Sequence, residues 1–138
     1  MTDMKSMLLT FIVALLVFPA FSQSTTAGKK AEDFIKFKEV KYNFGKIKQG
    51  TPVTHDFQFT NISGDLVIIE TATASCGCTT PKWPQAPVAK GGSEKITAGF
   101  NAATAGPFSK EIYVRVKGAD VPFAITITGE VVDAEAGK

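Results

Sequence analysis

The residues most able to do chemistry are two cysteines separated by one glycine, in Ser75-Cys76-Gly77-Cys78-Thr79-Thr80. They are the only cysteines in the 138-residue chain. Two thiols at this spacing can cycle between a dithiol and a disulfide, or they can bind a soft metal ion such as Cu(I) or Zn(II). The third interpretation is a structural turn with no further role.

A direct bond between Cys76 and Cys78 requires a bend in the chain. Residues two apart in an extended strand lie ~6.6 Å from each other, at the outer limit for a disulfide. Gly77 favours the bend because glycine adopts backbone angles that other residues avoid. Closing a loop of about three residues adds only ~1.6 kcal/mol, so such a bond is not needed for folding. A strained, exposed disulfide is typically oxidising and easily exchanged.

The metal interpretation needs ligands beyond Cys76 and Cys78. The only histidine is His55, and the three methionines all lie near the N-terminus. A closed zinc site cannot be completed from this set without carboxylates or a second chain, whereas two-coordinate Cu(I) is possible. We expect His55 to be partly buried with a hydrogen-bond partner, and a ligand or base role is the alternative. No resident cofactor is predicted.

A proline-rich segment follows the cysteines, Pro81-Lys82-Trp83-Pro84-Gln85-Ala86-Pro87. Three prolines exclude a helix or a central strand, so the segment is predicted to be a semi-rigid loop. Its Trp83 is a candidate ligand-binding residue that can stack on a sugar or a partner chain. The alternative, which we favour, is that Trp83 folds back and caps one end of the core.

The elements that must position these residues are strands. In segment 53–60, Val53, Phe57 and Phe59 point to one side and polar residues to the other. This alternation is typical of a strand with one face on a core and one face in water. Similar patterns occur in 96–100, 112–117 and 121–128, with an apolar run at 66–69 and one or two edge strands within 34–47. Turn residues separate these runs, so an all-β antiparallel sandwich of about seven strands is predicted over residues 34–133.

The N-terminus has the pattern of a cleaved signal peptide over residues 1–22. Lys5 precedes an apolar run from 7 to 18, and small residues stand at Ala20 and Ser22. The run is shorter than the ~20 residues of a membrane span, so no span is expected after cleavage. Residues 23–33 are predicted to be a flexible tether and residues 134–138 a C-terminal tail. The expected location is periplasmic or secreted.

Composition and motifs argue against nucleic-acid binding and against catalysis, but they do not identify a ligand. A formal net charge of +2 is too weak to indicate nucleic acid as a partner. The chain has no Ser-His-Asp set, no phosphate-binding glycine loop and no recognisable pair of carboxylates for acid–base catalysis. We therefore expect a protein that is not an enzyme.

Several motifs together resemble a known family. They are Tyr42-Asn43-Phe44-Gly45, Phe57-Gln58-Phe59-Thr60-Asn61, Ser75-Cys76-Gly77-Cys78-Thr79, Gly91, Phe100 and Gly106-Pro107-Phe108-Ser109-Lys110. They resemble a bacterial exported family catalogued as domain of unknown function fifteen seventy-three, over about Phe37 to Val132. The resemblance implies an immunoglobulin-like sandwich close to chaperone- and cilium-associated families, in which the domain is a binding module. It implies no activity.

Two functional hypotheses follow. The first is an exported immunoglobulin-like binding or structural module of the cell envelope, without catalysis. Its partner would be an unidentified envelope or extracellular protein or glycan, bound for example by strand addition at an edge near either terminus. The alternative is a periplasmic thiol-redox or copper-handling protein that acts through Cys76-Gly77-Cys78.

Overall fold

The computed structural model describes residues 27–135. The predicted signal peptide, part of the tether and the last residues of the tail lie outside this range. Within the range, the chain forms eight strands and one short 3-10 helix, Ala31–Asp33. No helix in this part of the chain has the length and apolar character needed to cross a membrane.

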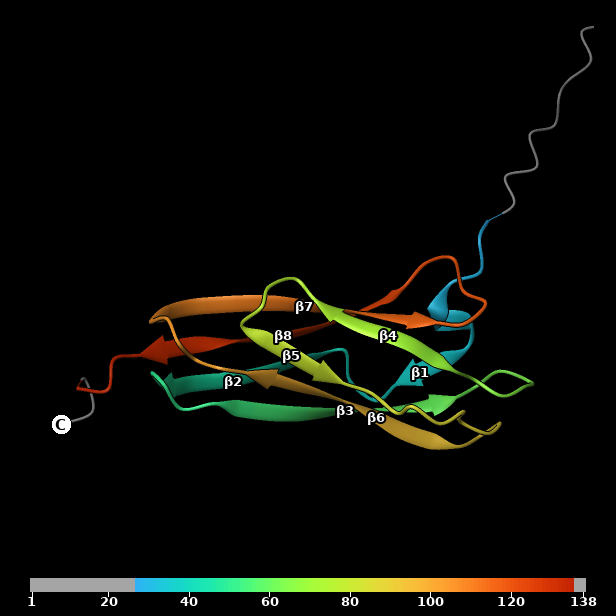
Figure 1. Ribbon diagram of the computed structural model, residues 1–138, viewed down its shortest axis with the longest axis horizontal. Helices are drawn as coiled ribbons and strands as arrows, with labels where there is room; N and C mark the ends of the chain where they lie inside the picture. Colours follow the sequence, from blue (N-terminus) through green and yellow to red (C-terminus); the bar gives the residue numbers. More distant parts are fainter. Residues whose placement is uncertain (1–26, 136–138) are drawn as a thin grey trace, which may run out of the picture.

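The strands stack as two sheets of four, which makes the molecule an immunoglobulin-like β-sandwich (Figure 1). The first sheet has the order β1-β3-β6-β5 and the second sheet the order β2-β8-β7-β4. The strands are β1 (Ile35–Phe37), β2 (Lys41–Lys48), β3 (Val53–Asn61), β4 (Ile69–Ala74), β5 (Thr79–Lys82), β6 (Ser93–Phe100), β7 (Gly106–Val116) and β8 (Phe123–Val132). The predicted sandwich is confirmed, with eight strands where about seven were expected.

The segment 34–47 forms two strands that belong to different sheets. β1 pairs antiparallel with β3, and after residues 38–40 the chain continues as β2, which pairs with β8. The β2–β8 pair is parallel, whereas the other strand pairs are antiparallel. β1 and β2 are therefore edge strands on one open side of the sandwich, and β4 and β5 are edge strands on the other.

The core lies between the two inner faces. The alternation predicted for segment 53–60 is present, because Phe57 and Phe59 are fully buried while Thr54 and Gln58 are exposed. Isoleucines from the other central strands complete the core: Ile96, Ile112, Ile125 and Ile127, all at 0% exposure. Each such side chain contributes roughly 1.5–3 kcal/mol by burial.

The folded part begins before the boundary that the sequence predicted. Ala31, assigned to the tether, is buried, and its N–H donates to the carbonyl of Val121 at 2.9 Å. The N–H of Lys29 donates to a carboxylate oxygen of Asp120, also at 2.9 Å. These contacts attach the segment before β1 to the loop between β7 and β8.

Two other expectations change. The apolar run 66–69 holds only an isolated bridge between Val67 and Val88, and β4 begins at Ile69 and continues to Ala74. Pro81 and Lys82, predicted to lie in a loop, are the end of β5. β5 is an edge strand, where a proline is tolerated because one side of the strand needs no hydrogen bond.

Candidate functional site

The cysteines lie where the chain passes from β4, the edge of the second sheet, to β5, the edge of the first. Residues 75–78 form this connection, and we refer to them as the disulfide turn. Cys76 and Cys78 are joined by a disulfide, and their Cα atoms lie 5.4 Å apart. This separation is shorter than the ~6.6 Å of an extended strand, so the predicted bend is present.

Backbone hydrogen bonds hold the turn against both sheets. Ser75 N–H donates to the carbonyl of Glu111 on β7 at 2.9 Å, and Asn101 N–H donates to the carbonyl of Cys78 at 3.0 Å. Within the turn, Thr79 N–H donates to the carbonyl of Cys76. Both cysteines are half-buried. The disulfide is therefore anchored at its ends and accessible between them.

Gly77 does not use the freedom that the sequence analysis attributed to it. The glycines with positive φ are elsewhere: Gly45, Gly50, Gly91, Gly106 and Gly118. A Cβ atom added to Gly77 would meet no other atom within 4 Å. The bend is compatible with other residue types at this position.

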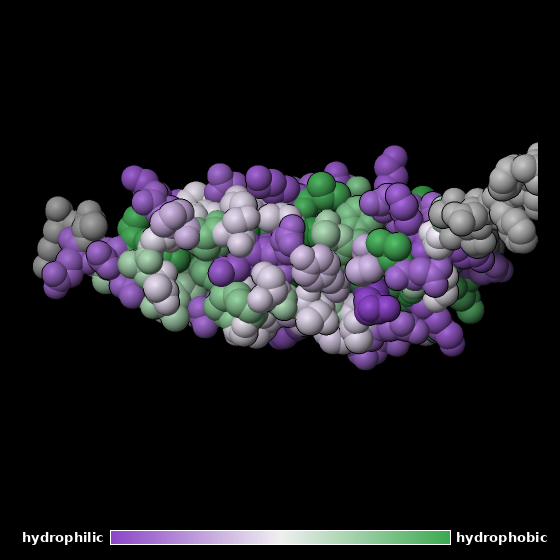
Figure 2. Space-filling model, turned by 90° about the horizontal axis from the view of Figure 1, so that it is seen from above, coloured by the Kyte–Doolittle hydropathy of each residue, from purple (hydrophilic) through white to green (hydrophobic). Residues whose placement is uncertain are grey.

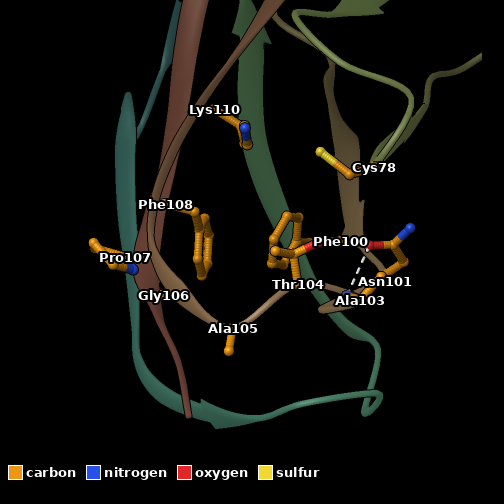
Figure 3. A pocket seen from close by; sticks show the side chains of 10 residues that line it. All are labelled: Cys78, Phe100, Asn101, Ala103, Thr104, Ala105, Gly106, Pro107, Phe108 and Lys110. Atoms are coloured by element: carbon orange, nitrogen blue, oxygen red, sulfur yellow. Dashed lines mark hydrogen bonds between the residues drawn. The ribbon is translucent and has the colours of Figure 1, made fainter. Parts of the chain in front are cut away.

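The two sulfurs share one buried neighbour but differ in their other surroundings. The Thr79 hydroxyl lies 3.9 Å from Sγ of Cys76 and 4.0 Å from Sγ of Cys78. Cys78 also packs against the hydrophobic core and lines a hollow of about 360 Å³ (Figure 3). We call this the Cys78 hollow; the other residues that line it are Phe100, Lys110 and segment 101–108.

A pair of aromatic rings forms the wall of the Cys78 hollow. Phe100 of β6 and Phe108 of β7 stack with ring centroids 4.0 Å apart and an angle of 21° between the planes. The two rings come from different sheets and join them at this end of the sandwich (Figure 3). Phe108 also covers Gly129 of β8, its partner in the register.

Lys110 is the charged residue of the Cys78 hollow. It alternates with Phe108 and Ile112 on the inner face of β7, and it is half-buried. Figure 3 shows Lys110 and Cys78 at the same end of the hollow, with the rings of Phe108 and Phe100 between them and Ala105. The ion pairs found in the part of the chain that the structure describes are His55–Glu39 and Lys95–Asp56, so Lys110 has no carboxylate partner there. Extending the alternation of Ile112 and Val114 back along the sequence would have placed Lys110 inward.

His55 lies in an aromatic cluster on β3, at a distance from this hollow. Its ring stacks on the ring of Tyr42, with centroids 3.5 Å apart and nearly parallel planes. The His55 ring also makes an edge-to-face contact with the ring of Phe57. Nε2 of His55 lies 2.7 Å from Oε1 of Glu39. His55 is therefore partly buried with a hydrogen-bond partner, as expected.

The structure does not bring His55 to the cysteines. Among residues 27–135, no group of three or more His, Cys, Asp and Glu side chains is placed to hold a metal ion. Both thiols are in the disulfide. The proposed set of Cys76, Cys78 and His55 is not assembled.

Trp83 follows β5 and packs against the core as a partly buried side chain. This is the position expected of a residue that caps one end of the core. Its carbonyl accepts a hydrogen bond from Nε2 of Gln85 at 3.2 Å, which fixes the local loop. The ring stacking on a ligand that the sequence suggested stays a prediction.

A further surface was not singled out from the sequence. β2 pairs only with β8, so its other side, here named the β2 edge, is open. Lys41, Lys46 and Lys48 on this strand are exposed and lie outside the ion pairs found in the described residues. By contrast, the face shown in Figure 2 has separate small apolar areas among polar side chains. The features that distinguish the β2 edge are its unpaired backbone and its three exposed lysines.

The backbone of the β2 edge is oriented for pairing. The carbonyl of Val40 accepts the N–H of Thr126 on β8 at 2.8 Å. In a trans peptide the N–H points opposite to the carbonyl, so the N–H of Lys41 points away from β8. A β-bulge between Asn43 and Lys46 interrupts the strand, with φ of +69° at Gly45. Glycine tolerates this angle because it has no Cβ.

Comparison with solved structures confirms the fold. The PapD-like domain 7 of human CEP192 superposes with a TM-score of 0.64 at 9% identity, covering 75% of this chain and 88% of that one. A protein of unknown function from Porphyromonas gingivalis W83 gives 0.60 at 12% identity, covering 78% and 50%. The VesB protease of Vibrio cholerae gives 0.57 at 15% identity, covering 74% of this chain and only 33% of the protease. At these identities the likeness concerns the fold alone.

No curated protein matches the sequence. A family model does match, over residues 35–131, and these residues include the disulfide turn, the Cys78 hollow and the β2 edge. This range is most of the chain and agrees with the resemblance seen in the motifs. The chain belongs to the family described as protein of unknown function (DUF1573).

Proposed function

We propose that this protein is an exported binding module of the cell envelope, without catalysis, that captures an extended acidic segment of a partner protein along the β2 edge. The observation that carries the proposal is the open side of β2 with its three exposed lysines. Export rests on the signal-peptide pattern of residues 1–22.

Strand addition supplies the affinity in this proposal. An extended segment lying beside β2 would accept hydrogen bonds from outward backbone donors such as the N–H of Lys41. Main-chain pairing of this kind is largely independent of sequence, so selection must come from side chains. The exposed edge of β2 offers positive charge, which attracts glutamate and aspartate and disfavours a second lysine-rich edge.

The immunoglobulin-like fold supports the proposal because each of its two open sheets has edge strands that are paired on one side only. β1 covers β3 only from Phe59 to Asn61, and β2 has no neighbour beyond β8. The part of β3 before Phe59 is therefore not covered by β1, and the whole outer side of β2 is open. The bulge at Gly45 divides the β2 edge into two short pairing segments, 41–43 and 46–48.

The test uses a defined probe, a ten-residue peptide that alternates valine and glutamate, added to the isotope-labelled mature protein. We expect amide shift changes along β2 and weaker binding as salt rises, because exposed charges are screened. A peptide that alternates valine and lysine is the control probe. Shift changes that map elsewhere, or equal binding of both peptides, would contradict the proposal.

Two variants separate charge from backbone. Replacing Lys41, Lys46 and Lys48 together by glutamate should abolish binding, whereas the same change at the exposed Lys82, Lys90 and Lys117 should not. Lys41→Pro removes one outward donor and one charge while leaving the hydrogen bond to Val40 intact, so it is compared with Lys41→Ala, which removes the charge alone, and should bind more weakly than that variant. The melting temperature of each variant establishes that it is folded.

A further inference from the structure

We propose that the disulfide turn is a thiol–disulfide exchange site at which an incoming thiolate attacks Sγ of Cys76 and Cys78 departs as a thiolate into the Cys78 hollow. This activity is separate from segment capture at the β2 edge, since β4 and β5 lie on the opposite open side of the sandwich. It assigns different roles to the two cysteines.

The first step of the argument is that the bond is accessible and is not needed to hold the sheets. The disulfide closes a loop of only three residues, which contributes ~1.6 kcal/mol in the chain-entropy model. Both cysteines are half-buried in a turn, not within a strand. The core of Phe57, Phe59 and the four buried isoleucines is formed without them.

The second step is the difference between the sulfurs. Cys78 lines the Cys78 hollow and also a smaller one of about 160 Å³, next to Val53 and Phe100. Cys76 lines neither. A thiolate released at Cys78 therefore borders a hollow, whereas Cys76 borders none.

The third step concerns the positive charge of Lys110 in the hollow that Cys78 lines. Lys110 lies in the same hollow as Cys78 and has no carboxylate partner among the described residues. A nearby ammonium group lowers the pKa of a thiol, and a thiol of lower pKa leaves faster in exchange. The Thr79 hydroxyl, within 4.0 Å of Sγ, can donate a hydrogen bond to the same thiolate. Lys110 is thus a positioning residue for the negative charge.

The exchange balances without a cofactor when the reductant is a dithiol of a partner protein. The first partner thiolate forms a disulfide with Sγ of Cys76 as the bond between Cys76 and Cys78 breaks, and Cys78 carries the negative charge. The second partner thiolate then attacks the partner sulfur and expels the Cys76 thiolate. Two electrons have passed from the partner dithiol, which becomes a disulfide, to this protein, which becomes a dithiol.

The site of attack can be read directly with reduced glutathione as the probe. The oxidised mature protein is mixed with glutathione, quenched with acid at early times, alkylated and sequenced by mass spectrometry. We expect glutathione on Cys76 and the alkyl group on Cys78, in about tenfold excess over the reverse arrangement. Equal labelling, labelling of Cys78, or no reaction would overturn the proposal.

Variants of β7 test the role of charge. Lys110→Met should slow exchange by about threefold or more, and Lys110→Arg should restore most of the rate because it keeps the charge. Lys117→Met, which changes an exposed lysine directly after β7, is the matched control and should react as the wild type. Equal rates for Lys110→Met and the wild type would remove Lys110 from the mechanism.

The two proposals fail independently. The variant with glutamate at positions 41, 46 and 48 should exchange with glutathione at the wild-type rate, because the β2 edge lies on the other side of the sandwich. Loss of exchange in that variant would contradict the separation of the two sites. Loss of peptide binding alone would leave the exchange site unaffected.

Discussion

Asp56 is held by two donors on the outer face of the first sheet. The Thr97 hydroxyl and the Lys95 ammonium each donate to its carboxylate at 2.6 Å, from the adjacent strand β6. The hydrogen bond from Lys95, followed by that from Thr97, lowers the pKa of Asp56 below its usual value. A carboxylate stabilised in this way favours the folded state only while it is ionised.

Replacing Asp56 by asparagine should therefore destabilise the protein in a pH-dependent way. The folded pKa is the lower one, so the stabilisation is present above the unfolded pKa and is lost as pH falls through the folded pKa. We expect a loss of less than about 1 kcal/mol near neutral pH, because the pair is exposed.

Urea unfolding at about pH 7 and about pH 2 measures the change, and the difference between Asp56→Asn and wild type should shrink at the lower pH. Glu94→Gln, which removes an exposed carboxylate that makes no ion pair in the described residues, is the control. A gap that is unchanged between the two pH values would show that ionisation of Asp56 is not the cause.

At the scale of elements, close contact between β7 and β8 depends on a glycine. Gly129 pairs with Phe108, and a Cβ at Gly129 would lie 2.8 Å from two atoms of the Phe108 ring and 2.9 Å from the carbonyl oxygen of Gly45. The ring is itself stacked on Phe100 of the other sheet. The Gly45 carbonyl belongs to the backbone of β2, so moving the Phe108 ring alone would not relieve the close approach.

Gly129→Ala should consequently cost about 1–3 kcal/mol of unfolding free energy, as overpacking does. Gly77→Ala is the matched control, because its Cβ would meet open space, and it should change stability by less than about 0.5 kcal/mol. Chemical denaturation of both variants makes the comparison. A Gly129→Ala protein as stable as Gly77→Ala would mean that Phe108 is not packed as described.

The same elements show how far the sequence was informative. β3, β6, β7 and β8 were predictable because large apolar side chains alternate with polar ones. β4 was not, since its Thr71 to Ala74 segment has too little apolar bulk to show a period. The parallel β2–β8 pair could not be predicted, because nothing local in either segment encodes a partner more than eighty residues away.

For the candidate site, the sequence could predict the features that depend on residues adjacent in the chain. The spacing of Cys76 and Cys78 left a disulfide, a metal site and a plain turn open, and showed that a disulfide would need a bend; the structure has the disulfide and the bend. The Cys78 hollow depends on β6 and β7, which bring Phe100 and Phe108 together from different sheets. The inward position of Lys110 continues the alternation of Ile112 and Val114, but no local signal showed that the strand extends back to Gly106.

At the scale of the whole molecule, the two candidate sites lie on opposite open sides of the sandwich. β1 and β2 form the edges of one side, while β4 and β5, joined by the disulfide turn, form the other. A partner segment at the β2 edge would therefore leave the disulfide accessible. Together, the two proposals have one molecule hold a partner at the β2 edge and exchange thiols at the disulfide turn.

This arrangement predicts that the disulfide can be removed without loss of the fold or of binding. The double variant Cys76→Ser, Cys78→Ser should lose no more than about 1.6 kcal/mol of unfolding free energy, because the closed loop is short and burial holds the sheets together. Its far-ultraviolet spectrum should remain that of a β protein, and its affinity for the valine–glutamate peptide should equal that of the wild type. Wild-type protein reduced with excess dithiothreitol is the control, because it lacks the disulfide but keeps both cysteine side chains. Unfolding of the double variant would show that the disulfide is needed for the fold, which contradicts the prediction. A folded double variant that loses the peptide would show that the disulfide turn is coupled to the β2 edge, so that exchange there would alter capture.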